Sequence, residues 1–190
     1  MTSQWSQSDV DFVARSAARS SKKRQNPNPR SAAQGLSVLS EAATDVIAAQ
    51  QAHGLDEPWE RDDFVPRVVS LQRRRQVAPL PADVNVQVFD RSPMCTLALT
   101  RFLRRPVPPL LAAEVDRILT EHVYEPRVLL VRPLGFVQAT AARRITYEES
   151  LVFERVHIAV YCEHGFTLID VPPAEVSRRV AVVNRLLHAR

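Results

Sequence analysis

Short apolar runs alternate with longer amphipathic stretches along this chain. The runs at 35–41, 84–89, 127–131 and 166–171 are apolar or β-branched, which predicts buried strands, and 9–13 predicts a weak first strand. Apolar residues at helical spacing predict helices at 42–53, 56–75, 93–105, 110–121, 146–163 and after the prolines at 172–173. Alternating strands and helices of this kind predict an α/β fold with a parallel sheet covered by helices on both faces.

The strand at 84–89 is the most informative part of the pattern. It ends in Asp90-Arg91, and Ser92 and Pro93 then suit the N-cap and first position of a helix. Ligands of open α/β sheets bind beyond the carboxyl ends of the strands, where Asp90 and Arg91 would stand. Asp90 could hold Mg²⁺ or accept a hydroxyl proton, and Arg91 could grip phosphate. The alternative is an ordinary first-turn acid with a solvated arginine; we favour the functional interpretation.

Two further positions suggest the same chemistry. Glu41 ends the strand at 35–41, so it could act as a general base beside Asp90, or it could simply be a first-turn helix acid stabilised by the helix dipole. Arg143 and Arg144 lie in a long loop after a buried strand, where paired arginines would suit a transferring phosphoryl group. The alternative for these arginines is a solvated pair matched by the acids of the next helix.

Charge and cysteine content narrow the class of protein. The 190 residues carry a formal charge of +4, but residues 14–34 hold six basic side chains and no acid, so the rest totals about −2. The globular part is therefore no general binder of polyanions. Cys95 and Cys162 lack metal-ligand spacing, and no apolar run suits a membrane span or a secretion signal. These features indicate a cytoplasmic protein with a tail and weak strand at 1–13, a basic irregular segment at 14–34 and one domain at 35–190.

From residue 35 onward the order of motifs resembles small P-loop NTPases, AAA-domain ATPases related to nucleoside and nucleotide kinases. The matching pieces are an acid before a helix, an acidic-Trp segment, a VFDR-type strand end, an apolar strand before a proline, an arginine lid before acids and a Gly-Phe strand ending in Val-Pro. They lie at 41–47, 56–59, 88–91, 129–133, 143–149 and 165–172.

The resemblance implies a three-layer P-loop NTPase-like parallel sheet that binds ATP or GTP with Mg²⁺. It implies an ATPase, or a phosphotransferase acting on a small-molecule acceptor. Asp90 matches the position for metal or acceptor, Arg91 the one for phosphate, and Glu41 the acid beside them. Arg143 and Arg144 match the lid.

One element of that family is missing from the sequence. The first strand should lead into GxxxxGK[ST], whose backbone N–H groups cradle phosphates. Residues 14–34 contain no glycine, and Lys22 and Lys23 stand without residues that tolerate such a turn. We therefore expect poor ATP binding, with out-of-frame or degenerate sequence in this place; a GxxxxGK[ST] in another reading frame of the coding DNA would identify a frameshift.

Two other interpretations of the chain stay open. It could be a catalytically inactive binding or regulatory module that keeps the acceptor pocket. Alternatively, residues 14–34 could form a nucleic-acid arm, which predicts salt-sensitive binding that is lost on deletion of the segment. The arm is disfavoured because the segment has no aromatic residue to stack on bases.

Overall fold

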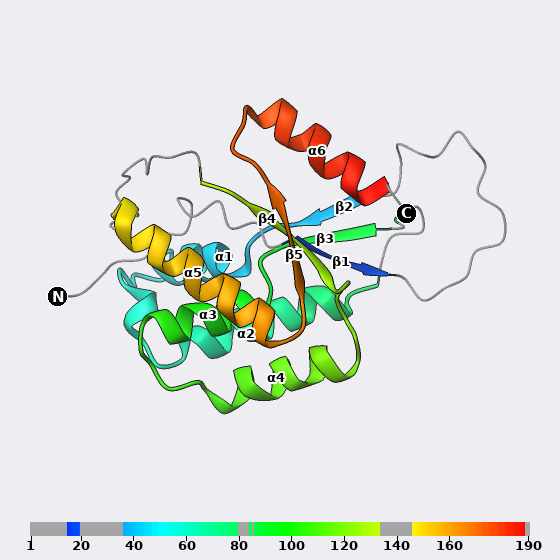
Figure 1. Ribbon diagram of the computed structural model, residues 1–190. Helices are drawn as coiled ribbons and strands as arrows, with labels where there is room; N and C mark the ends of the chain where they lie inside the picture. The colour runs from blue at the N-terminus through cyan, green and yellow to red at the C-terminus, as the bar shows by residue number, and fades with distance from the viewer. Residues whose placement is uncertain (1–14, 20–35, 80–83, 85, 134–145, 189–190) are drawn as a thin grey trace.

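A computed structural model describes residues 15–19, 36–79, 84, 86–133 and 146–188 of the chain (Figure 1). Its strands are β1 (Arg15–Arg19), β2 (Leu36–Leu39), β3 (Val86–Asp90), β4 (Arg127–Val131) and β5 (Thr167–Val171). Its helices are α1 (Ala42–Gln51), the short 3-10 helix η2 (Pro58–Glu60), α2 (Phe64–Val77), α3 (Pro93–Phe102), α4 (Pro109–Thr120), α5 (Tyr147–Glu163) and α6 (Val176–His188). The predicted alternation of strands and helices is confirmed.

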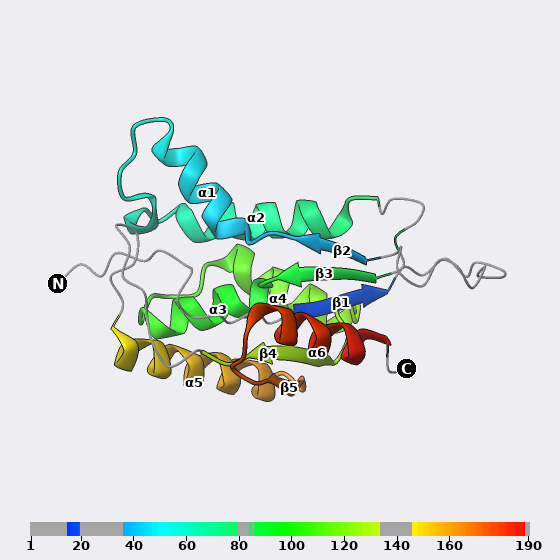
Figure 2. The same cartoon turned by 90° about the horizontal axis from the view of Figure 1, so that it is seen from above.

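The five strands form one sheet in the order β2-β3-β1-β4-β5. β2 runs parallel to β3, and β4 runs parallel to β5. Helices α2 to α5 lie on one face of the sheet and α6 lies on the other, while α1 packs beside α2 near the β2 edge (Figures 1 and 2). The expected three-layer α/β architecture with helices on both faces is therefore present.

The two faces of the sheet bury different amounts of apolar surface. On the face of α2 to α5, Phe89 and Val128 contribute to a core that includes Met94, Leu111 and Val160. On the opposite face, strands β4 and β5 pack against the carboxyl-terminal half of α6 through a smaller cluster. That cluster holds Leu129, Val131, Val171 and Val183.

Strand β1 differs from what the sequence predicts. It pairs antiparallel with both of its neighbours, and Arg15 lies opposite Asp90 while Arg19 lies opposite Val86. The strand falls inside the segment expected to be irregular, and it contains no β-branched or aromatic residue that would signal it. Pairing with apolar β3 stabilises it, which is a tertiary effect. The weak strand expected at 9–13 lies outside the described residues.

One local prediction needs correction. The helix expected at 56–75 is divided into η2 and α2, because the backbone of Arg61 is extended (ψ 146°). Val176 and Val180 of α6 are exposed, since the apolar contacts of α6 with the sheet come from its second half. Val152 of α5 is exposed, because the buried side of α5 runs through Phe153.

Candidate functional site at the carboxyl ends of β2 and β3

The two acids predicted to share a site stand on neighbouring strands. Leu39 at the end of β2 lies opposite Phe89 of parallel β3, so both chains leave the sheet at the same edge. Asp90 is the last residue of β3, and Glu41 follows β2 as the N-cap of α1. The structure thus brings Glu41, Asp90 and Arg91 to one edge of the sheet, as the sequence predicts.

The turn from β3 into α3 takes only two residues. Ser92 is extended, and its Oγ accepts a hydrogen bond from the Met94 N–H, which confirms the predicted N-cap; Pro93 occupies the first helical position. Arg91 must therefore reverse the chain alone, and it adopts a left-handed backbone with φ 68°. This conformation folds its side chain back toward β2.

Arg91 and Glu41 form a buried ion pair. Arg91 Nε lies 2.5 Å from Glu41 Oε1, and only 8 % and 11 % of the two side chains are exposed. Among the described residues, this oxygen accepts no hydrogen bond. The second carboxylate oxygen, Oε2, accepts from the Thr44 hydroxyl at 2.9 Å. Arg91 is thus directed at Glu41, although the resemblance implies contact with phosphate.

Burial dominates the protonation of Glu41. It raises the pKa of this carboxyl from an ordinary 4.5 to about 7, even though Arg91 and the Thr44 hydroxyl favour the charged form. The nearby Asp90 and Asp45 carboxylates also raise the pKa of Glu41. Burial of Arg91 opposes its charge, but Glu41, Asp90 and the other acidic groups around it together outweigh burial and raise the pKa of Arg91, so it stays a cation. A carboxyl that titrates near neutral pH can act as a general base, so this arrangement is suited to proton transfer.

Helix α5 supplies a second set of residues that the sequence analysis missed. Tyr161 is fully buried; its hydroxyl lies 2.8 Å from Ser92 Oγ and 3.3 Å from Cys95 Sγ. His157, one turn earlier, donates from Nδ1 to the Phe153 carbonyl at 2.9 Å. Burial, together with the charge of Arg91, lowers the pKa of His157 to about 3. The signal was the spacing of 153, 157 and 161, which places three aromatic rings on one helix face, two of them, His157 and Tyr161, with polar atoms.

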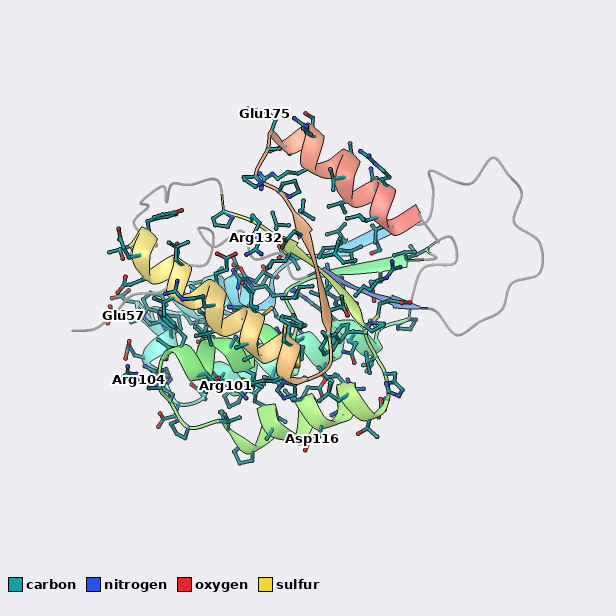
Figure 3. The ribbon with its side chains drawn as sticks, viewed as in Figure 1. Glu57, Arg101, Arg104, Asp116, Arg132 and Glu175 are labelled. Carbon is teal, nitrogen blue, oxygen red and sulfur yellow. The ribbon has the colours of Figure 1, made fainter. Side chains whose placement is uncertain are left out.

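Another polar cluster lies along the same sheet edge, beyond β4 and β5. Arg132 follows β4, and its Nε–H donates to Asp170 Oδ1 at 2.9 Å while its guanidinium also pairs with Glu154 of α5 (Figure 3). Two acids thus neutralise Arg132. Arg143 and Arg144, the predicted lid arginines, lie outside the described residues, as do Lys22 and Lys23.

A site for nucleotide and Mg²⁺ needs a metal ligand and a phosphate-binding loop. The described residues fit the first of these better than the second. Within the described ranges no cluster of three or more metal-ligating side chains occurs. Asp90 nevertheless fits the common mode in which Mg²⁺ takes one carboxylate besides phosphate oxygens and water. The phosphate half fits poorly, because antiparallel β1 ends at Arg19, opposite Val86, at the sheet edge away from Asp90. A P-loop would have to follow β1 at the Asp90 edge.

Comparison with known proteins supports the family assignment. A family model described as an AAA domain matches residues 30–179, which is most of the chain and excludes residues 1–29. This match confirms the resemblance to P-loop NTPases seen from residue 35 onward. No curated protein and no solved structure gives a match. In the parts of the chain that the structure describes, no helix is long and apolar enough to cross a membrane.

Proposed function

This chain belongs to the AAA domain family of P-loop NTPase-like nucleotide-binding proteins, and from that premise we propose that it is by lineage an ATP- or GTP-dependent ATPase or small-molecule phosphotransferase with impaired activity. The observation that carries the proposal is the joint placement of Glu41 and Asp90 at the ends of neighbouring parallel strands. The reversed direction of β1 supports impairment, because no described residue of that strand leads into the Asp90 edge.

Each side chain has a role in this proposal. Asp90 would hold Mg²⁺, which neutralises phosphate charge when it is bound. Glu41, whose pKa burial raises to about 7, would accept the proton of an acceptor hydroxyl. Arg91 keeps Glu41 oriented through their ion pair. Arg143 and Arg144 would neutralise phosphate, as the family resemblance implies.

A second candidate function is a catalytically inactive binding or regulatory module that retains the acceptor side. The observation that favours it is the inward direction of Arg91, which is buried against Glu41 and presents little surface to a phosphate. Such a module would bind an acceptor-like small molecule without turning over nucleotide.

Calorimetric titration of MgATP and MgGTP into the full chain, with a parallel assay of phosphate release, tests both candidates. We expect millimolar binding and slow turnover, both weakened by Asp90→Ala. Asp116→Ala is the matched control, since Asp116 is an exposed acid of α4 on the far side of the helix layer (Figure 3). Binding without any turnover would favour the inactive module.

Two outcomes would reject the proposal. Micromolar affinity with rapid turnover would show that the activity is not impaired, and Lys22 or Lys23 would then be the first residues to substitute. No heat and no turnover at millimolar nucleotide would show that the chain has lost nucleotide binding altogether.

A further inference from the structure

Arg91 has a backbone conformation that its neighbours in sequence do not explain. Besides glycine, the described residues include three with positive φ: Arg91, Arg104 and His122. Arg104 and His122 each follow the last residues of a helix, where a left-handed residue closes the helix end, and the following N–H bonds back to Thr100 and Ile118. Arg91 lies instead between a strand and a helix. Contacts from elsewhere in the fold must therefore hold it in this conformation.

One of these contacts reaches the turn from α5. The Tyr161 hydroxyl lies 2.8 Å from the Oγ of Ser92, the residue directly after Arg91, and 3.3 Å from Sγ of Cys95, one turn later in α3. All three side chains are buried, so none can exchange this contact for water without cost. Tyr161 thus holds the first turn of α3 from α5.

We propose that Tyr161 is a positioning residue, whose hydroxyl holds the first turn of α3 so that Arg91 stays left-handed and paired with Glu41. The inference rests on the proposed function only for the role of the Arg91–Glu41 pair in proton transfer. It extends the site to α5, which contacts neither Asp90 nor Glu41 through any bond described above. Tyr161 acts through Ser92 and Arg91, and touches no reacting group.

The side-chain Nε–H of Arg91 offers a direct measurement of the pair. In the full chain labelled with ¹⁵N-arginine, its resonance is assigned by its loss in Arg91→Lys, and its exchange with solvent reports how firmly the buried guanidinium is held beside Glu41. We expect Tyr161→Phe to accelerate this exchange by about fivefold or more, because the α3 turn loses a buried hydrogen bond. The measurement uses no nucleotide, so failed nucleotide binding does not affect it.

Tyr124→Phe is the matched control. Tyr124 is another buried tyrosine, and its hydroxyl accepts a hydrogen bond from Gln76 at 2.9 Å, away from the α3 turn. Both variants should lower the unfolding temperature, but only Tyr161→Phe should change Arg91 Nε–H exchange. Equal exchange rates in the two variants, or an unchanged rate in Tyr161→Phe, would overturn the proposal.

A second pair of variants applies if Tyr161→Phe does not fold. Ser92→Ala removes the hydrogen bond to Tyr161 from the α3 side together with the N-cap of α3. Thr146→Ala removes a comparable N-cap from α5. Faster Arg91 Nε–H exchange in Ser92→Ala alone supports the proposal. Equal rates of Arg91 Nε–H exchange in Ser92→Ala and Thr146→Ala would overturn it.

Discussion

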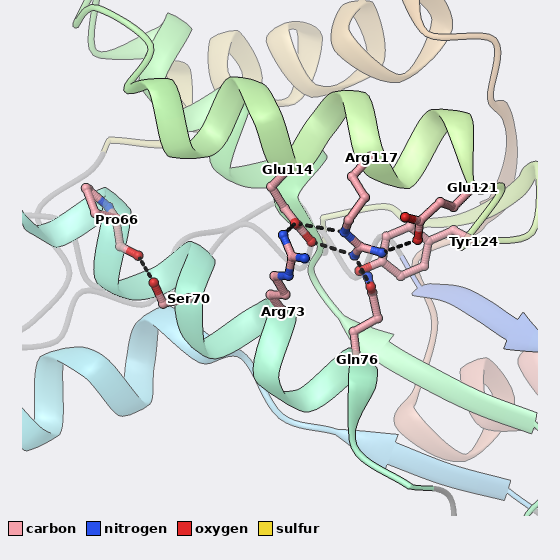
Figure 4. A network of polar contacts seen from close by, with 8 residues as sticks. All are labelled: Pro66, Ser70, Arg73, Gln76, Glu114, Arg117, Glu121 and Tyr124. Carbon is pink, nitrogen blue, oxygen red and sulfur yellow. Dashed lines mark hydrogen bonds and ion pairs between the residues drawn. The ribbon is translucent and has the colours of Figure 1, made fainter.

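Two buried glutamates in this protein face arginine in different ways. Glu114 of α4 is 1 % exposed and receives hydrogen bonds from Arg73 at 3.2 Å and from Arg117 at 3.0 and 2.7 Å (Figure 4). Arg117 is bonded in turn to Glu121 and Gln76. Glu41 has one contact from Arg91 and one from Thr44.

The difference separates a structural acid from a candidate functional one. Around Glu114 both carboxylate oxygens accept from arginine, as in a satisfied network that joins α2 to α4. Around Glu41 compensation is incomplete, and burial raises its pKa to about 7. A carboxyl with a pKa near neutral pH can exchange a proton during a reaction, and its position at a sheet edge suits that role. The same raised pKa lowers the free energy of unfolding at high pH.

The largest effect should come from breaking the Glu114 network. Glu114→Gln leaves the mostly buried Arg117 guanidinium with the exposed Glu121 as its charged partner, and we expect a loss of about 3 kcal/mol in the free energy of unfolding. Urea denaturation measures it. Glu121→Gln removes the exposed partner of the same arginine and should cost less than about 1 kcal/mol. Equal losses in the two variants would contradict the structural role assigned to Glu114.

The next effect depends on pH and concerns Glu41. Its pKa is higher in the folded chain than the ordinary 4.5, so the folded state holds a proton that the unfolded state has released. The contribution of Glu41 to the free energy of unfolding is therefore complete below pH 4.5 and is lost as pH rises through 7. Over this window, wild type should lose up to about 3 kcal/mol relative to Glu41→Gln.

Denaturation of both proteins between pH 4.5 and 8 gives that difference. His157 titrates in the opposite sense, because its pKa is lowered; its contribution is complete above 6.5 and is lost as pH falls toward 3. Subtracting Glu41→Gln from wild type removes the His157 contribution from the comparison. A difference that is constant with pH would show that Glu41 has an ordinary pKa.

Thr44→Val probes the second contact of Glu41 and should have a smaller effect. Loss of the hydroxyl donor favours the neutral carboxyl, so we expect a further rise in the pKa of Glu41 and a loss of about 1 kcal/mol above pH 7 that shrinks at lower pH. Ser70→Ala is the control, since its hydroxyl donates to the Pro66 carbonyl in α2 (Figure 4). Its effect should not vary with pH; the same pH dependence in both variants would contradict the assignment to Glu41.

The two regions also differ in how far the sequence predicts them. Asp90, Glu41 and the Ser92 cap follow strand ends, and local patterns of hydrophobicity and capping locate them. The partner of Arg91 could not be predicted, because its direction depends on a left-handed backbone that no glycine signals. Nor does the sequence indicate the partner of Arg73, which bonds Glu114, 41 residues away. Such pairings depend on which helix faces meet.

The antiparallel strand β1 could be predicted least. Its sequence, Arg-Ser-Ala-Ala-Arg, has weak strand propensity, and only its neighbours in the sheet determine its pairing. The central position between β3 and β4 is filled by whatever segment supplies backbone hydrogen bonds to both strands. Local sequence therefore predicts the elements on either side of that position better than the one within it.

The smallest expected effect distinguishes the two arginines of the Glu114 network. Arg73 is 52 % exposed and makes one bond to Glu114, whereas Arg117 is 15 % exposed and makes two. Arg73→Gln should therefore cost less than about 0.5 kcal/mol at low salt and almost nothing at high salt, because dissolved ions screen the exposed charge of Arg73. Arg117→Gln should cost several times more at every salt concentration, since Glu114 then stays buried with one solvated partner. Denaturation of both variants at low and high salt tests this. A salt-independent loss above about 2 kcal/mol in Arg73→Gln would mean that both arginines are needed to keep Glu114 charged. Glu114 and Glu41 would then differ in the number of arginines that contact each of them.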